Sequence, residues 1–242
     1  MSLSAKFRER PFAHRGLHDI AAGVVENSVS AFDAAVEADY AIELDVQMSR
    51  DGVPVVFHDD TLDRLTARHG QVADLTAEEL GTVSLGASAD RILTLSAVLD
   101  RIGGRVPVLV EIKDQAGRDG LPAAVGRDIA AAAGPIAVMS FNPSYIHALE
   151  GLDAPRGLTT CAADDYGPDL PPETRDRLGR ILGWTPSLSF VSRDHRHLTD
   201  PRIAELKAEG AGILCWTIRS QAEADAALRI ADQITFEVFQ PR

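Results

Sequence analysis

The stretch that decides the fold is residues 41–60, which read AIELDVQMSRDGVPVVFHDD. Residues 41–47 have a strand pattern, because successive side chains of a strand point to opposite faces and the acidic Glu43 and Asp45 alternate with apolar residues. Asp51-Gly52 lies between β-like flanks and predicts a hairpin with a two-residue type I′ turn. In that register Asp45 faces His58, and directly opposed Cβ atoms lie about 4.5–5.5 Å apart. We therefore expect the hairpin to fold His58 back beside the end of the strand.

On both sides of this stretch, short β-like runs alternate with helix-like ones. The other β-like runs are residues 11–14, 106–113, 135–141, 156–161, 187–192, 212–218 and 233–239. Such alternation favours parallel strands joined by right-handed crossovers. Eight is the number of strands that closes a (β/α)8 TIM barrel, which is the α/β fold we predict. A doubly wound open sheet is the alternative, but no glycine-rich fingerprint follows the first strand.

The length of the chain predicts one domain. A single α/β barrel commonly has about 250 residues, and this chain has 242. We therefore predict one barrel domain over residues 1–242. Residues 60–92 contain DLTAEEL and several Gly and Ser residues. They are predicted to form a small insertion after the second strand and its hairpin, with a short helix of its own.

Composition and charge limit the partners. Hydrophobic residues make up 45% and charged residues 25% of the chain, as in an ordinary globular protein, and the formal net charge is −12. Such a field disfavours nucleic acid and anionic membrane surfaces, although a few cations in one pocket can still bind a small anion. The two cysteines, Cys161 and Cys215, are too few for a disulfide framework or a zinc site.

Targeting and membrane signals are weak in this sequence. The first residues have no apolar core of a secretory signal, and the longest uncharged stretch, residues 129–145, is too short and broken to span a bilayer. We expect a cytoplasmic protein without stable membrane insertion. The sequence gives no indication of its oligomeric state.

Three carboxylates are predicted to converge at one end of the sheet. Glu43 and Asp45 are two residues apart and point to one face of their strand, and Glu111 belongs to the neighbouring predicted strand. Carboxylates that face into a closed barrel are costly unless a cation neutralises them. Ligands that are all oxygen favour Mg²⁺ or Ca²⁺ over metals that prefer thiolates. We therefore expect one divalent cation, Mg²⁺ or Ca²⁺.

Taken singly, each polar residue has an ordinary explanation, such as a solvated barrel rim or a hydrogen-bonded structural histidine. Six of them, however, fall near the carboxyl ends of different predicted strands, where barrel enzymes place their chemistry. These six are His14, Glu43, Asp45, Glu111, Lys113 and Trp216. A joint site explains this coincidence better than six separate roles. The remaining histidines have no matching partner and are assigned to loops, the insertion or a helix surface.

This set of residues suits phosphoryl chemistry. A divalent cation and the charges of Arg15 and Lys113 can neutralise phosphate oxygens. One imidazole can remove a proton from the attacking hydroxyl while the other protonates the leaving alkoxide. A covalent serine mechanism has no candidate, because the sequence has no G-x-S-x-G element.

Several motifs resemble those of the glycerophosphodiester phosphodiesterases. They are AHRG (13–16), ENS (26–28), IELDVQMSRDGVPVVFHDDTLDR (42–64), LTLSAVLD (93–100), EIK (111–113) and WTI (216–218). The resemblance runs from residue 13 to about residue 237. It implies a (β/α)8 barrel of the phosphatidylinositol-phospholipase-C-like kind. It also implies a phosphoric diester hydrolase that, with a divalent cation, converts a small-molecule glycerophosphodiester into glycerol 3-phosphate and an alcohol.

The resemblance also assigns roles by position. It implies acid/base roles for His14 and His58, metal ligation by Glu43, Asp45 and Glu111, phosphate contacts from Arg15 and Lys113, and a pocket wall at Trp216. The reaction it implies uses the glycerol hydroxyl next to the phosphate to displace the alcohol. Water then opens the resulting cyclic phosphate.

The match weakens near the C-terminal end. Family members continue WT with a small residue and Asn and close with a segment like GVDGIITDYP, whereas this chain has WTIRS and RIADQITFEVF. The departures, Arg219 and Glu237, are expected near the mouth of the barrel and leave the alcohol head group open. Arg219 either adds a second anion contact or faces solvent.

Other functions remain as alternatives. A lysophospholipase D- or sphingomyelinase D-like enzyme on the same fold would need an apolar entrance, and the sequence shows no obvious exposed apolar loop. A non-catalytic barrel that binds a phosphorylated metabolite is the alternative of a different class. An amidohydrolase-like metal centre is disfavoured, because the first predicted strand has no H-x-H pair.

Overall fold

The structure, a computed structural model, describes residues 3–185 and 187–242. Residues 1, 2 and 186 of the predicted domain lie outside the described residues. Eight parallel strands form a closed barrel: β1 (Phe12–Ala13), β2 (Ala41–Met48), β4 (Val108–Ile112), β5 (Ile136–Ser140), β6 (Arg156–Thr160), β7 (Phe190–Asp194), β8 (Gly212–Ile218) and β9 (Gln233–Phe236). The barrel closes because β1 pairs with both β2 and β9. The predicted (β/α)8 TIM barrel is confirmed.

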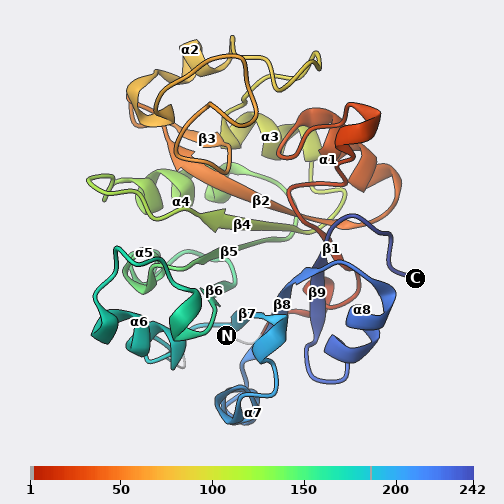
Figure 1. The fold of residues 1–242 in the computed structure, drawn as a ribbon, viewed down its shortest axis with the longest axis vertical. Coiled ribbons are helices and arrows are strands. Elements are labelled where there is room, and N and C mark those ends of the chain that lie inside the picture. The colour runs from red at the N-terminus through yellow and green to blue at the C-terminus, as the bar shows by residue number, and fades with distance from the viewer. Residues whose placement is uncertain (1–2, 186) are drawn as a thin grey trace.

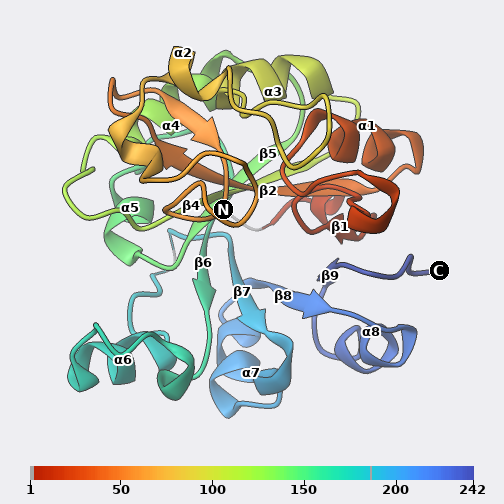
Figure 2. The ribbon, with the colours of Figure 1, turned by 45° about the horizontal axis from the view of Figure 1, so that its top comes forward.

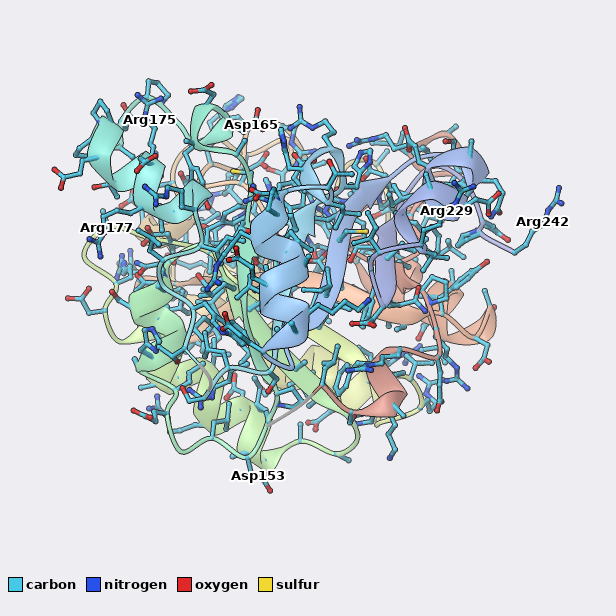
Figure 3. All side chains as sticks on the ribbon, turned by 90° about the horizontal axis from the view of Figure 1, so that it is seen from below. Asp153, Asp165, Arg175, Arg177, Arg229 and Arg242 are labelled. Carbon is cyan, nitrogen blue, oxygen red and sulfur yellow. The ribbon has the colours of Figure 1, made fainter. Side chains whose placement is uncertain are left out.

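Helices lie outside the strands (Figures 1 and 2). They are α1 (Val29–Glu37), α3 (Leu95–Ile102), α4 (Leu121–Ala131), α5 (Pro143–His147), α6 (Pro172–Gly179), α7 (Pro201–Ala208) and α8 (Gln221–Ala227). Short 3-10 helices are η1 (Ala5–Phe7), η2 (Ile20–Ala22), η3 (Val72–Asp74), η4 (Ala163–Asp165) and η5 (His195–His197). Charged side chains such as Asp153, Arg177 and Arg229 are exposed on the outer surface (Figure 3).

Helix α3 illustrates how the sequence sets these elements. The Thr94 side chain accepts a hydrogen bond from the backbone N–H of Ala97 and so caps the helix. Its large apolar residues recur at helical spacing and are buried against the barrel: Leu95, Val98, Leu99 and Ile102. The main hydrophobic core therefore lies between the helices and the outer face of the strands.

The amino end of the barrel is filled by apolar side chains. Phe12 and Phe190 are fully buried inside it, and Leu3 and Phe7 of the N-terminal segment pack into the same cluster. A Cβ atom added at Gly157 would lie 2.4 Å from the Phe190 ring, so only glycine fits there. Because this end is packed, polar side chains that face inward are left to the carboxyl end.

The hairpin after β2 differs from its prediction. Strand β3 (Pro54–Val56) pairs antiparallel with β2, and Val46 lies opposite Val56. Gly52 has a φ of +79°, whereas Arg50 and Asp51 do not have positive φ values, so the predicted type I′ turn is wrong. The loop has three residues, a type I turn followed by a left-handed glycine.

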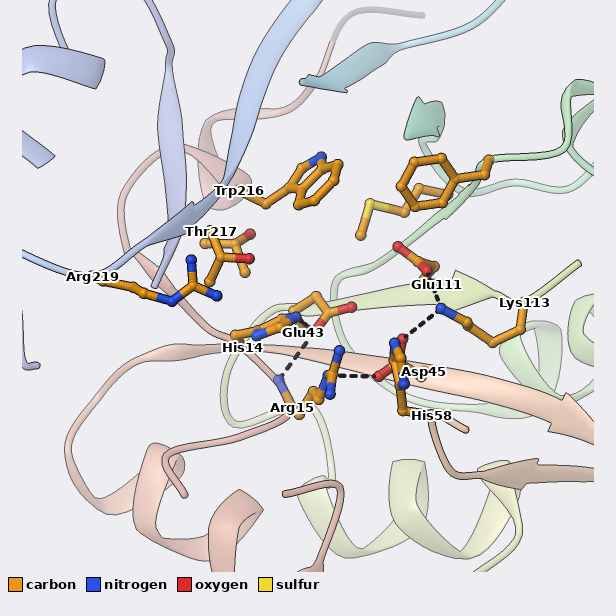
Figure 4. Close-up of a pocket in the computed structure, with 13 residues that line it drawn as sticks. His14, Arg15, Glu43, Asp45, His58, Glu111, Lys113, Trp216, Thr217 and Arg219 are labelled. Carbon is orange, nitrogen blue, oxygen red and sulfur yellow. Dashed lines mark hydrogen bonds and ion pairs between the residues drawn. The ribbon is translucent and has the colours of Figure 1, made fainter. Parts of the chain in front are cut away.

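The extra loop residue shifts the register by one. Asp45 therefore lies opposite Phe57, whose backbone N–H donates to the Asp45 carbonyl at 3.1 Å, and not opposite His58. His58 lies beyond the end of the β2–β3 ladder. It still reaches the carboxyl end of the barrel, because the chain leaves the hairpin in that direction (Figure 4).

Residues 60–92 build a second hydrophobic cluster beside the hairpin. Its buried members include Leu62, Val72, Leu80, Leu85 and Ile92, and they pack against Val55 and Phe57. The short helix α2 (Ala77–Leu80) begins with a capping box, in which Thr76 and Glu79 each accept the other's backbone N–H. This segment lies beyond β3 and α3, at the top of Figure 1.

Candidate active site

All eight residues predicted from the sequence line one cavity of about 220 Å³ at the carboxyl ends of the strands (Figure 4). They are His14, Arg15, Glu43, Asp45, His58, Glu111, Lys113 and Trp216. The other lining residues are Met139, Phe141, Thr217, Arg219 and Thr235. Because the carboxyl ends of all barrel strands lie at the same end of the barrel, residues up to about 200 positions apart in the chain meet in this cavity.

The carboxylate cluster consists of Glu43 and Asp45 on β2 and Glu111 on β4. Asp45 and Glu111 are direct partners in the parallel register of these strands. All three are buried, and each offers an oxygen within 4.8 Å of the others. Burial raises the pKa of Glu43 well above its ordinary value, and the negative charges of Asp45 and Glu111 add to that shift.

Two cations neutralise part of this cluster. Lys113 Nζ lies 3.0 Å from Glu111 Oε1 and 3.6 Å from Asp45 Oδ1, and Arg15 Nε lies 3.2 Å from Asp45 Oδ2. Burial by itself would raise the pKa of Asp45, but the charges of Lys113 and Arg15 outweigh it and hold that pKa well below the ordinary value. Burial would likewise lower the pKa of Lys113, but Glu111 and Asp45 together raise it.

The cluster fits a hard divalent cation. Glu43 accepts a hydrogen bond from the backbone N–H of Arg15 at 3.0 Å, but its side chain is 2% exposed, and among the described residues its one ion-pair partner is His14 Nε2 at 4.0 Å. A divalent cation shared by the three carboxylates would supply the compensating charge. Oxygen donors alone are the ligand set that Mg²⁺ and Ca²⁺ prefer. Glu43, Asp45 and Glu111 could therefore hold a metal ion.

The loop after β1 aims Arg15 into the site. Arg15 has a φ of +56°, and the following Gly16 has a φ of +80°. A Cβ atom at Gly16 would lie 2.8 Å from that of Ala31 on α1, so the tight turn requires glycine there. The Arg15 guanidinium then reaches Glu26 at 2.5 Å. Its burial disfavours the charged form, but Asp45 and Glu26 outweigh this and raise the pKa of Arg15.

The ENS motif has a structural role that the sequence analysis missed. Ser28 caps α1 by accepting the Ala31 N–H at 3.2 Å. Asn27, the residue before this cap, donates from Nδ2 to Asp45 Oδ2 at 2.9 Å. Glu26 accepts hydrogen bonds from Arg15, which lies in the cavity, and from Arg64, which lies in the segment after the hairpin. The signal for these roles is the motif itself, since three consecutive polar residues before a helix exceed what one cap requires.

His14 lies directly after β1 and is held from its Nδ1 side. This atom is 2.6 Å from Glu237 Oε2, and its Nε2 is 4.0 Å from Glu43 Oε2. Arg219 binds the other oxygen of Glu237, with Nε at 2.8 Å and Nη2 at 2.6 Å. The hydrogen bond to His14 and the charge of Arg219 lower the pKa of Glu237 to about 2. Arg219, expected either to contact an anion or to face solvent, therefore pairs with Glu237.

His58 is held in the same way by residues of its own loop. Its Nδ1 is 2.6 Å from Asp59 Oδ1, and Arg64 Nε donates to Asp59 Oδ2 at 2.6 Å. The hydrogen bonds from Arg64 are the main cause that lowers the pKa of Asp59 to about 2. Gln47, the next inward-facing residue of β2 after Asp45, fixes this loop by donating to the Phe57 carbonyl at 3.1 Å.

An apolar wall closes the opposite side of the cavity. Trp216 on β8 and Phe141 after β5 meet edge to face, with ring centroids 5.5 Å apart. Trp216 Nε1 donates to the Ser192 carbonyl at 3.1 Å, which fixes the indole in place. The cavity therefore has one charged side and one aromatic side.

A second acidic group lies outside this cavity. Asp165, Asp194 and His197 could also approach one cation. Arg196 already compensates their charge, since its Nη2 lies 3.0 Å from Asp165 and its guanidinium binds Asp194. This group therefore needs no metal ion.

Hydrolysis of a phosphate ester requires positive charge aimed at a small cavity and groups that move protons beside it. Arg15, Lys113 and a cation on the carboxylate cluster would supply the charge, and His14 and His58 lie within the same cavity. The fold and this cavity therefore define a barrel-type hydrolase of phosphate esters.

Similarity to known proteins narrows this class. The sequence pattern of the glycerophosphoryl diester phosphodiesterase family matches residues 14–233. This chain belongs to that family, and it is a phosphoric diester hydrolase. YhdW of Bacillus subtilis is 30% identical over 223 residues, which span 88% of this chain and 87% of that protein. A glycerophosphodiester phosphodiesterase of Caldanaerobacter subterraneus is 43% identical over 110 residues, or 42% of this chain and 44% of that relative.

Solved structures share the fold. A phosphodiesterase of Oleispira antarctica, solved in complex with the product sn-glycerol-3-phosphate, has a TM-score of 0.77 and 23% identity, and the match covers 96% of this chain and 93% of that one. A glycerophosphodiester phosphodiesterase of Thermotoga maritima has a TM-score of 0.74 and 20% identity, with 94% of each chain covered.

Proposed function

We propose that this protein hydrolyses small-molecule glycerophosphodiesters to glycerol 3-phosphate and an alcohol, with one divalent cation and with His14 and His58 as general acid and base. One observation carries the proposal. Two imidazoles, each bound through Nδ1 to a carboxylate, line the same cavity as three buried carboxylates and two cations.

Glu43, Asp45 and Glu111 are the residues that would hold Mg²⁺ or Ca²⁺. When bound, such a cation neutralises charge that develops on the phosphate oxygens. Arg15 and Lys113 act on the same oxygens from either side of Asp45, and Trp216 forms the wall against which the substrate packs. This division leaves the two histidines free for proton transfer.

The carboxylate partners determine what each histidine can do. A carboxylate accepts but does not donate, so Nδ1 of each ring carries a proton and Nε2 of the neutral ring is a free base. One histidine takes a proton from the attacking hydroxyl, and the other, as imidazolium, gives a proton to the leaving alcohol. The described residues that line the cavity include neither serine nor cysteine, so we assign the attack to the glycerol hydroxyl next to the phosphate and the opening of the cyclic phosphate to water.

The decisive test is a coupled assay for glycerol 3-phosphate. Glycerophosphodiesters of choline, ethanolamine, glycerol and inositol are offered with Mg²⁺, with Ca²⁺ and with excess chelator. We expect turnover of at least one diester with a divalent cation, and none with chelator. Full activity in chelator would reject the cation, and no product from any diester would reject the substrate class.

The histidines have a separate test. His14→Ala and His58→Ala should each lower kcat by at least ~100-fold, the usual contribution of a general acid or base. His69→Ala is the matched control, since His69 is exposed and pairs with Asp63 away from the cavity. Near-normal turnover in either cavity variant would remove that histidine from the mechanism.

One observation favours a second candidate, a lysophospholipase D-like activity. The sequence predicted no exposed apolar loop, but Ile20 and Val238 are 73% and 75% exposed, and both line a surface cavity of about 440 Å³ with Leu17 and Phe239. This cavity is built by the residues that follow the His14 loop and by those that follow Glu237. An acyl chain would fit such a surface, and a sphingomyelinase D-like substrate carries chains of the same kind.

Lysophosphatidylcholine tests this candidate when the release of choline is measured, because the other product would be lysophosphatidic acid and not glycerol 3-phosphate. Ile20→Asn and Val238→Asn should then lower its turnover and leave that of glycerophosphocholine unchanged. Equal effects on both substrates, or no turnover of the lipid, would reject it. A non-catalytic barrel is the outcome if no phosphodiester in the panel is cleaved.

Cellular location and domain organisation stay predictions. No helix among residues 3–185 and 187–242 has the length and apolar character needed to cross a membrane. A cytoplasmic location, no nucleic-acid partner and a single domain with an insertion at 60–92 are parts of our proposal.

A further inference from the structure

Glu237 and Arg219, the two departures from the family pattern, lie at the rim of the active site. Glu237 follows β9 and Arg219 follows β8, so neighbouring strands of the barrel bring them together. The two Glu237 oxygens have different partners: Oε2 is 2.6 Å from His14 Nδ1, and Oε1 binds Arg219 at 2.6 and 2.8 Å. The three side chains therefore form one chain that ends at the imidazole.

We propose that Glu237 and Arg219 are positioning residues for His14: Glu237 fixes the orientation and tautomer of the imidazole, and Arg219 fixes the carboxylate. The inference rests on the proposed function, in which His14 transfers a proton through Nε2.

The carboxylate is suited to this task. Its side chain is 15% exposed, the same as that of His14, so water competes little for the bond between them. The low pKa of Glu237 keeps it ionised at neutral pH, when it can only accept a hydrogen bond. Nδ1 of His14 then keeps its proton whether the ring is neutral or charged. Proton exchange is directed to Nε2, which faces Glu43 and the cavity.

Arg219 is poorly placed to act as an independent anion site. Two of its guanidinium nitrogens bind a single oxygen of Glu237, so its charge is compensated before any substrate arrives. The backbone N–H of Arg219 also donates to Glu223 at 2.7 Å, which holds the start of this segment. The pair thus leaves Oε2 of Glu237 to His14.

The same construction occurs independently at the other histidine. His58 Nδ1 is 2.6 Å from Asp59, and Arg64 binds that carboxylate in turn. The residues come from different elements, since Asp59 and Arg64 belong to the segment after the hairpin. Two histidines held alike in one cavity indicate a requirement of the site rather than a chance surface pair.

A double-mutant cycle tests the inference. Glu237→Gln, Arg219→Gln and the double variant are assayed with saturating divalent cation on the best diester of the panel. We expect Glu237→Gln to lower kcat at least ~10-fold with little change in KM, because only the orientation and charge of His14 are affected. Arg219→Gln should lower kcat less, and the double variant should equal Glu237→Gln alone.

Several outcomes would overturn the inference. Additive losses, or a raised KM in Arg219→Gln, would make Arg219 a substrate contact. Unchanged kcat in Glu237→Gln while His14→Ala is inactive would show that His14 needs no positioning. Full activity of His14→Ala would instead contradict the proposed function, so the two failures are distinguishable.

A matched control and a spectroscopic measurement separate positioning from stability. Arg101→Gln removes a guanidinium that is 57% exposed, as Arg219 is, and that binds both oxygens of Asp33 away from the cavity. It should leave kcat unchanged. In the folded Glu237→Ala variant, the ¹⁵N NMR signals of His14 should change from the Nδ1-protonated tautomer to a mixture of tautomers. An unchanged tautomer would contradict the proposal.

Discussion

Lys113 lies between two buried carboxylates, with its Nζ 3.0 Å from Glu111 and 3.6 Å from Asp45. Lys113→Met would leave both carboxylates without this cation. Removing one partner of a buried ion pair costs more stability than removing one partner of an exposed pair, because the remaining charge stays buried. Because the Lys113 side chain is 21% exposed, we expect a loss of about 1–3 kcal/mol in the metal-free protein. That corresponds to a fall of several degrees in Tm.

A divalent cation should reduce this loss, because it takes over the neutralisation of the same carboxylates. Thermal unfolding of wild type and Lys113→Met in chelator and with Mg²⁺ or Ca²⁺ measures the difference. The same fall in Tm under both conditions would show that no cation binds next to Lys113.

Eight of the thirteen described residues that line the cavity were predicted from the sequence, but the partners that hold them were not. Six of the eight follow from one rule, since each lies near the carboxyl end of a predicted strand, whereas His58 was placed by the hairpin and Arg15 directly follows His14. Asn27, Asp59, Arg64 and Glu237 contact the site across elements whose loops have no periodic pattern. Their hydrogen bonds depend on where each loop folds, which residue types and spacing do not specify.

The β2–β3 hairpin also shows how far the sequence predicts the structure of an element. Asp51-Gly52 predicts a turn at the correct place, but both two- and three-residue loops accept this dipeptide. The structure has the longer loop, with only Gly52 in the left-handed region. His58 reaches the cavity nonetheless, because Gln47 holds the loop that follows the hairpin. Strand positions were therefore predictable, whereas the register depended on one residue.

Glu26 ties the end of β1 to the segment that follows the hairpin, since it binds Arg15 at 2.5 Å and Arg64 at 2.8 Å. Burial alone would raise the pKa of Glu26, but the hydrogen bonds and charges of the two arginines lower it. A carboxyl group whose pKa is lowered on folding stabilises the protein above its unfolded pKa of about 4.3. This stabilisation is lost as the pH falls through the folded pKa.

Glu26→Gln should therefore destabilise the protein at pH 7, and its difference from wild type should shrink below about pH 5. Urea unfolding of both proteins across this range measures the difference. Glu37→Gln, at an exposed position of α1, is the control and should change little at any pH. A Glu26→Gln difference that grew towards low pH would contradict the assigned charge state.

Inside the barrel, the Phe190 side chain of β7 packs directly against the backbone of Gly157 on β6. Gly157→Ala would place a methyl group 2.4 Å from the fully buried Phe190 ring. Overpacking of this kind typically costs about 1–3 kcal/mol. Gly167→Ala is the matched control, since its added Cβ meets nothing within 4 Å. Denaturant unfolding should show the loss for the first variant only, and equal stabilities would mean that the barrel interior is looser than the structure shows.

The net charge of the whole protein opposes the binding of an anionic substrate. The net charge is −12, and at the cavity two cations (Arg15 and Lys113) face three carboxylates (Glu43, Asp45 and Glu111), while Glu237 already compensates the charge of Arg219. A phosphate therefore meets no net attraction until a divalent cation joins the carboxylates. Its binding should then depend on salt with opposite signs in the two states, because salt screens repulsion in one and attraction in the other.

Calorimetric titration with glycerol 3-phosphate measures this dependence. We expect binding to be at least ~10-fold weaker in chelator than with Mg²⁺ or Ca²⁺. The two positive charges of the cation turn the net negative charge of the cavity into a net positive one. Raising the ionic strength to about 0.1 M and beyond should strengthen the weak binding and weaken the tight one. Equally tight binding in chelator would place the attraction in Arg15 and Lys113 alone and would leave the carboxylate cluster without a role in substrate capture.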